Sequence, residues 1–156
     1  MNRFVSFAGL IAALLFTGCA STVQHVPMPN LSQTIDDPAR GRIYVMRPAS
    51  FGAAISMHVM DGGEAIGDTG PKGFLCWERS PGDVILTSSS ENSSRISLPV
   101  RAGQVYYVHQ HVRMGWWIAR TELEAVEEAQ GKLLLKQCKP AKVEQPEGPL
   151  ADGKRK

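Results

Sequence analysis

The sequence predicts an all-β fold, an antiparallel β-sandwich-like domain with one short C-terminal helix. Two observations support this prediction. Between residues 41 and 138, most segments alternate apolar with polar residues at a period of two, as half-buried strands do. Gly and Pro, at 15 and 10 of 156 residues, separate these segments with turns. The net charge of +2 does not favour a nucleic-acid partner.

Residues 1–18 have the pattern of a secretory signal peptide. Arg3 precedes an apolar run over residues 4–16, which is shorter than the roughly 20 residues of a membrane-spanning helix. The run ends in Leu15-Phe16-Thr17-Gly18-Cys19, which resembles the lipobox of bacterial lipoproteins. The resemblance implies that Cys19 is lipidated, with acyl chains such as palmitate, and that Ala20 and Ser21 direct the protein to the outer membrane, facing the periplasm. An ordinary signal peptide that leaves a free thiol at Cys19 is the alternative.

The segments on either side of the domain show no sustained periodicity. Residues 19–40 are predicted to be a lipid anchor and tether, because Pro27, Pro29 and Pro38 block regular pairing. Residues 139–156 are predicted to be a disordered tail, because they contain too few aliphatic side chains to offset the entropy of ordering them. The β-sandwich-like domain is therefore expected to span residues 41–138.

Each strand of the domain is predicted from its alternation or its β-branched content, and each is bounded by a turn signal. The turns are Pro48, Asp61-Gly62-Gly63, Pro81-Gly82, the Ser/Asn-rich residues 88–94 and Ala102-Gly103. The strands they delimit are residues 42–47, 55–60, 64–68, 73–79, 83–88, 95–100, 104–114 and 117–126.

The C-terminal helix is predicted over residues 127–138, which have acidic residues first and lysines last, as the helix dipole favours. Leu134, Leu135 and Cys138 would form an apolar edge that packs on the sheet. Gly131 weakens this helix. A shorter helix before Gly131, followed by a strand at residues 133–135, is the alternative.

Three motifs of the domain resemble an uncharacterised bacterial lipoprotein domain family. They are GRIYVMRP at residues 41–48, the turn Pro81-Gly82, and AGQVYYV at residues 102–108. The family opens with a Y-x-x-R-P strand and places a P-G turn and a G-x-x-Y-Y-V strand later, in the same order. The resemblance covers about residues 41–136 and implies a β-rich, periplasm-facing domain without established activity or catalytic residues.

Cys76 and Cys138 are an even pair of cysteines in a compartment where disulfides persist, so they are candidates for a bridge. The alternative is two buried thiols that pack as small apolar groups.

Three histidines are candidate metal ligands. His109 and His111 have the i, i+2 spacing that places both imidazoles on one face of a strand, and His58 could supply a third ligand. Ordinary surface histidines are the favoured interpretation, and the acidic residues near residue 124 are interpreted as a solvated face. We therefore assign no metal.

Trp116 and Trp117 follow the strand that carries these histidines. Adjacent strand residues point to opposite faces, so one Trp is expected in the core and the other at the surface. The exposed Trp would be a candidate contact for a partner, a glycan or the membrane interface. The alternative is that both fill the ends of the sandwich.

No motif in the sequence indicates catalysis, since the serines at residues 88–94 lack a G-x-S-x-G pattern and no phosphate-binding glycine loop is present. We predict an outer-membrane lipoprotein, not an enzyme and without a cofactor, that acts as a binding or structural module of the cell envelope. Its expected partners are the membrane, through Cys19, and another envelope protein. One alternative is a subunit of a larger envelope secretion or export assembly, and another is a metal-binding protein that uses His58, His109 and His111.

Overall fold

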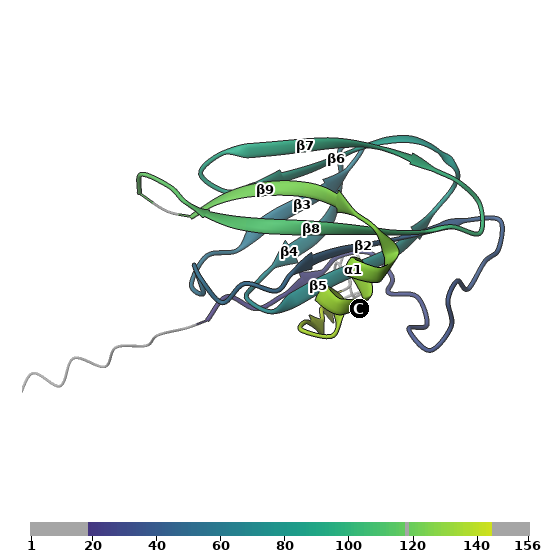
Figure 1. Ribbon diagram of the computed structural model, residues 1–156, viewed down its shortest axis with the longest axis horizontal. Helices are drawn as coiled ribbons and strands as arrows, with labels where there is room; N and C mark the ends of the chain where they lie inside the picture. The colour runs from purple at the N-terminus through teal and green to yellow at the C-terminus, as the bar shows by residue number, and fades with distance from the viewer. Residues whose placement is uncertain (1–18, 118, 145–156) are drawn as a thin grey trace, which may run out of the picture.

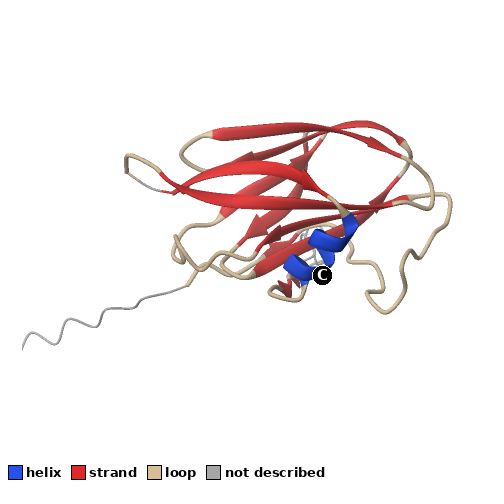
Figure 2. Cartoon of the chain, viewed as in Figure 1, coloured by secondary structure: helices blue, strands red, loops and turns tan. Residues whose placement is uncertain are grey.

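Two stacked β-sheets and one short helix form the computed structural model, which describes residues 19–117 and 119–144. The first sheet has the strand order β11-β1-β4-β3-β6-β7, and the second has the order β10-β5-β2-β8-β9. Figure 2 shows that strands dominate the chain. The elements are β1 (Val23–Gln24), β2 (Gly41–Arg47), β3 (Met57–Asp61), β4 (Glu64–Thr69), β5 (Gly73–Arg79), β6 (Gly82–Ser89), β7 (Ser93–Val100), β8 (Val105–Met114), β9 (Ala119–Val126), α1 (Glu128–Leu135), β10 (Lys139–Pro140) and β11 (Lys142–Val143).

The all-β, sandwich-like fold predicted from the sequence is confirmed, and the eight predicted strands correspond to β2 through β9. The sheets are mixed rather than purely antiparallel, because β2 pairs in parallel with β8, β10 with β5, and β1 with β11. Alternation of apolar and polar residues shows which face a side chain takes but not the direction of the neighbouring strand.

The central strand β2 is buried along its whole length and separates two apolar clusters. Ile43 and Val45 point into the main core between the two sheets. Tyr44 and Met46 point to the opposite face of the second sheet, where α1 covers a smaller cluster. A strand buried on both faces carries an almost continuous apolar run, which is the pattern of this segment.

The helix α1 forms where it was predicted and continues through residues 133–135, so the alternative with a strand there is wrong. Gly131 is its buried residue: a Cβ built at this position would lie 2.2 Å from Cγ of Tyr107. Glycine therefore weakens the helix locally but lets it approach the ring of Tyr107 closely.

Both ends of the domain extend beyond the predicted limits. In the predicted tether, β1 pairs with β4 and β11, and the buried Gln24 side chain accepts from the Cys76 N–H (2.9 Å) and donates to the Cys76 carbonyl (2.8 Å). In the predicted tail, Lys139–Pro140 form β10 and Lys142–Val143 form β11. The predictions of a tether without structure before residue 41 and of a tail without structure directly after residue 138 were therefore wrong. Strands of two residues, and a side chain that bonds to backbone groups, leave no periodic pattern in the sequence.

The signal peptide predicted at residues 1–18 and residues 145–156 of the tail lie outside the described residues. Within residues 19–117 and 119–144, no helix has the length and apolar character needed to cross a membrane.

Candidate binding pocket and neighbouring sites

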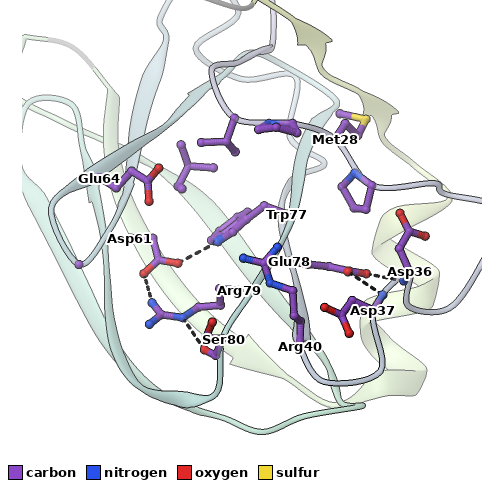
Figure 3. A pocket seen from close by; sticks show the side chains of 15 residues that line it. Met28, Asp36, Asp37, Arg40, Asp61, Glu64, Trp77, Glu78, Arg79 and Ser80 are labelled. Atoms are coloured by element: carbon purple, nitrogen blue, oxygen red, sulfur yellow. Dashed lines mark hydrogen bonds and ion pairs between the residues drawn. The ribbon is translucent and has the colours of Figure 1, made fainter.

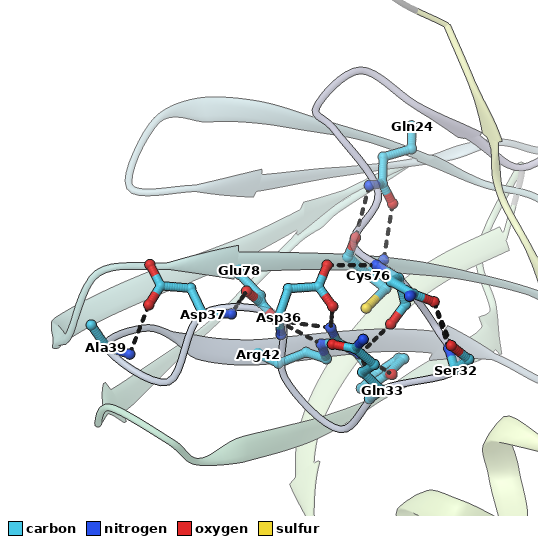
Figure 4. A network of polar contacts seen from close by, with 11 residues as sticks. Gln24, Ser32, Gln33, Asp36, Asp37, Ala39, Arg42, Cys76 and Glu78 are labelled. Atoms are coloured by element: carbon cyan, nitrogen blue, oxygen red, sulfur yellow. Dashed lines mark hydrogen bonds and ion pairs between the residues drawn. The ribbon is translucent and has the colours of Figure 1, made fainter.

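Arg42, near the start of β2, holds the loop of residues 28–40 against the second sheet (Figure 4). Its guanidinium is fully buried and donates to Glu78 on the adjacent strand, at 2.8 and 3.0 Å, and to Asp36 at 3.1 Å. It also donates to the Gln33 carbonyl at 2.6 Å. The Glu78 carboxylate accepts from the backbone N–H groups of Asp36 and Asp37. One buried ion pair thus fixes the loop.

A second polar contact lies at the ends of β3 and β5. The indole Nε1 of Trp77 donates to Asp61 at 2.8 Å, and the Arg79 guanidinium pairs with the same carboxylate. Asp61 is only 7% exposed, so both partners compensate a buried charge.

The two polar clusters border a pocket with a volume of about 840 Å³. Figure 3 shows Trp77 between Asp61 and Arg79 on one side and Glu78 and Asp36 on the other. Carboxylates outnumber guanidinium groups in the lining by five to two, and apolar side chains contribute the rest of the wall. The carboxylates are Asp36, Asp37, Asp61, Glu64 and Glu78, the guanidiniums are Arg40 and Arg79, and the larger apolar residues are Val26, Met28, Ile66 and Trp77. Such a pocket favours a ligand with a positive charge and an apolar part.

No local sequence pattern indicates this pocket. Its residues come from the loop of residues 28–40, the β3–β4 turn and the end of β5, which are distant in the chain. The available signal was the excess of acidic over basic residues at residues 36–37, 61 and 64, but nothing local indicates that these segments meet.

Both tryptophans of the β8–β9 turn are exposed, Trp116 to 88% and Trp117 to 93%. The expectation that one enters the core was wrong, because both lie in the turn, where strand alternation does not apply. Their backbone N–H groups donate to the Glu91 carboxylate at 3.1 and 3.2 Å. The neighbouring β6–β7 turn thus positions the backbone while the rings remain in solvent.

Cys19 is exposed. The start of the described chain, purple in Figure 1, lies at the same end of the molecule as the β8–β9 turn. The next residue, Ala20, donates its N–H to the Ala53 carbonyl at 2.7 Å. In the same loop, a Cβ at Gly52 would lie 3.1 Å from Cβ of Ala119, the first residue of β9. The half-exposed Phe51 belongs to this loop. Cys19, Phe51 and the two tryptophans therefore share one end, and the loop of residues 28–40 lies at the other.

Arg47, the last residue of β2, organises the loop beside Cys19. Its buried guanidinium donates to four backbone carbonyls, those of Phe51, Gly52, Ile55 and Thr69. Arg47 is the arginine of the Y-x-x-R-P motif, which gives that motif a structural role: the arginine closes the loop that follows the strand.

The three predicted histidines are not brought together. His58 lies on β3 of the first sheet, where it contacts the Asp68 carboxylate. His109 and His111 lie side by side on β8, with ring centroids 3.7 Å apart. The group that joins them is Glu124 of β9, which is paired with His109 in register and lies 2.7 Å from Nε2 of His111. The sequence indicates only a solvated face at Glu124, since the proximity of Glu124 to the histidines depends on the register of the hairpin.

The same contacts affect the ionisation of this cluster. Burial, and then the neighbouring His111, lower the pKa of His109. The hydrogen bond with His111 lowers the pKa of Glu124. At neutral pH, the cluster thus contains a neutral His109 and an ionised Glu124.

Cys76 and Cys138 are free cysteines that contact the apolar cluster beneath α1. No bridge joins them in the structure, which has the alternative arrangement, two thiols packed among apolar side chains. Burial raises the pKa of Cys76 to about 12 and that of Cys138 to about 11.

These features define a β-sandwich domain with a charged pocket at one end and exposed aromatic side chains at the other. Residues 37–122 match the model of a family described as proteins of unknown function, DUF2846, and the chain belongs to that family. An uncharacterised protein of Haemophilus influenzae is 25% identical over 124 residues, which cover 77% of this chain and 74% of that protein. The expected relation to an uncharacterised domain family is confirmed.

Proposed function

We propose that this protein is a lipid-anchored, non-catalytic binding module of the bacterial envelope, located at the outer membrane and facing the periplasm. One observation carries the proposal: Cys19, the cysteine of the lipobox-like motif, is exposed at one end of the sandwich, and the charged pocket lies at the other. Lipid attached at Cys19 would place the pocket away from the bilayer, where it can meet a partner.

The side chains around Cys19 are suited to a membrane surface. Trp116, Trp117 and Phe51 present aromatic rings at this end, and Trp in particular is favoured at the level of lipid headgroups. Lys72, Lys139 and Lys142 line a hollow together with Cys19 and can attract anionic headgroups. These contacts would add to the acyl chains and orient the domain.

The pocket favours a partner that carries positive charge. The five carboxylates of the lining exceed the guanidiniums of Arg40, Arg79 and the buried Arg42, which pairs with Asp36 and Glu78, so the pocket keeps an excess of negative charge. Its apolar wall can accept aliphatic or aromatic groups. A Lys- or Arg-bearing segment of another envelope protein has both properties. Restriction of both proteins to a thin layer raises their effective concentration, so weak binding is sufficient.

The anchoring part of the proposal is tested by metabolic labelling. The full chain, expressed in a bacterium that processes lipoproteins, should incorporate a palmitate analogue and fractionate with outer membranes, and the Cys19→Ala chain should do neither. Labelling that persists in the Cys19→Ala chain, or no labelling of the original chain, would overturn it.

The pocket is tested by photo-crosslinking in cells. A crosslinking amino acid at Glu64, at the rim of the pocket, should give a discrete adduct, and the same amino acid at Arg120, an exposed residue of β9, should not. The Asp37→Lys change should weaken the Glu64 adduct because it removes negative charge from the lining. Equal adducts at both positions, or none at Glu64, would contradict a partner in this pocket.

A further inference from the structure

The outer face of the second sheet carries a cluster of metal-ligating side chains next to the region that α1 covers. His109, His111 and Glu124 each offer one ligand atom, and the three atoms lie within 4.8 Å of one another. His109 and His111 are half-buried, whereas Glu124 is exposed, so the cluster is accessible from solvent.

The backbone holds these three residues in fixed positions. β8 and β9 are paired without interruption from Tyr107↔Val126 to Met114↔Ala119, and this ladder places Glu124 opposite His109. On the core side of β8, the fully buried Gln110 donates to the Ser88 hydroxyl at 2.6 Å and accepts from Thr69. Because Gln110 lies between the two histidines and is anchored in the core, the backbone that carries both imidazoles is held in place.

One nitrogen of the cluster has no partner. Nδ1 of His109 is buried without a hydrogen bond to any of the described residues. A buried polar atom without a partner is unfavourable, and a cation coordinated at this nitrogen itself would compensate it. A neutral imidazole and an ionised carboxylate are also the forms that bind metals.

We propose that His109, His111 and Glu124 bind one divalent transition-metal ion of the zinc class. Two imidazole nitrogens and one carboxylate oxygen are a donor set that suits Zn²⁺, whereas Ca²⁺ and Mg²⁺ prefer oxygen ligands alone. Binding replaces the hydrogen bond between His111 and Glu124 with two bonds to the ion. A tetrahedral ion would have its fourth position open to water or to a side chain of a partner. This site does not depend on lipid at Cys19 or on the charged pocket.

Isothermal titration tests the proposal on the full chain, purified without a histidine tag. The Cys19→Ala change removes the exposed thiol, which would otherwise compete as a zinc ligand. After treatment with a chelator, ZnCl₂ should bind with a stoichiometry of one and raise the melting temperature. MgCl₂ and CaCl₂ should do neither. Co²⁺ at the same site should give the visible absorption of a tetrahedral complex.

Single substitutions then assign the ligands. His109→Ala, His111→Ala and Glu124→Gln should each weaken zinc binding by more than about tenfold, because loss of a ligand costs more than loss of a group that orients one. Two matched controls should leave the affinity unchanged: His58→Ala, a histidine of the other sheet, and Glu122→Gln, the acidic neighbour on β9. The melting temperature without metal shows that each variant is folded. The proposal is overturned by an absence of zinc binding, or by binding that survives the loss of both β8 histidines.

Discussion

Arg42 and Glu78 face each other on adjacent strands and form an ion pair that is almost completely withdrawn from water, with side-chain exposures of 0% and 6%. Arg42 reaches the loop of residues 28–40 through the Asn30 and Gln33 carbonyls, and Glu78 reaches it through two backbone N–H groups. The pair therefore joins the second sheet to the loop that forms one wall of the pocket.

Glu78→Ala is expected to destabilise the protein by about 3–5 kcal/mol, because it leaves the Arg42 guanidinium buried without its main partner. Urea unfolding measures the effect. Glu122→Ala breaks an exposed ion pair with Arg113 and should change the free energy of unfolding little. If the two variants were equally stable, the buried pair would have no special role.

Gly131→Ala should destabilise the protein by about 1–3 kcal/mol although alanine favours helices, because the new methyl group meets the Tyr107 ring. Thermal unfolding of a double-mutant cycle separates the two effects. In a Tyr107→Ala background the same change should become neutral or stabilising by up to about 1 kcal/mol. A stabilising effect in the original background would show that α1 does not pack this closely.

The pH dependence of stability should include a contribution from His109. Burial, His111 and Arg113 lower the pKa of His109 in the folded protein, and Glu124 opposes them. As the pH falls, the unfolded chain therefore takes up a proton at this histidine before the folded protein does. Stability should therefore fall as the pH drops below about 6.5, the ordinary value for histidine. The free energy of unfolding, measured in the presence of a chelator from pH 8 to pH 5, should fall less steeply for His109→Phe than for the original chain. An unchanged slope would contradict the assignment.

The two cysteines beneath α1 should be alkylated slowly in the folded protein, since raised pKa values, about 12 for Cys76 and about 11 for Cys138, leave little thiolate at pH 8. In denaturant without reductant, mass spectrometry of the Cys19→Ala chain should show two alkyl groups added rapidly. A denatured chain that adds none, and weighs two hydrogens less, would instead contain a disulfide.

The paired change Trp116→Ala and Trp117→Ala should leave the melting temperature nearly unchanged, because both rings are exposed. It should reduce binding of the unlipidated Cys19→Ala chain to vesicles that contain anionic lipid, measured by co-sedimentation. Ile85→Ala, an exposed apolar residue of β6, is the control and should bind as the original chain does. Equal binding by all three chains would exclude the tryptophans from membrane contact.

Local sequence patterns predicted those parts of the fold that depend on local interactions. The β-branched and aromatic residues around Ile43 and Val108 located β2 and β8, but the parallel pairing of these strands joins segments about sixty residues apart and has no local signal. Glu124 lies beside the histidines only through the register of the β8–β9 hairpin, and the pocket joins segments that are distant in the chain, so neither has a local signal. The placement of Trp116 and Trp117 was wrong for a different reason. Strand β9 begins at Ala119 rather than at residue 117, so both tryptophans lie in the turn and not in an alternating strand.

The pairing of β1 with β4 and β11 affects how the domain withstands mechanical load. In the proposed orientation, a partner that pulls on the pocket stretches the molecule along its long axis between that end and Cys19, roughly parallel to the strands (Figure 1). The β-ladder bonds of β1, and those from Gln24 to β5, cross this direction. Such bonds are loaded in shear and must break together rather than one at a time. If Cys19 is anchored as proposed, the short strand next to it would act as a mechanical clamp between the membrane and the sandwich.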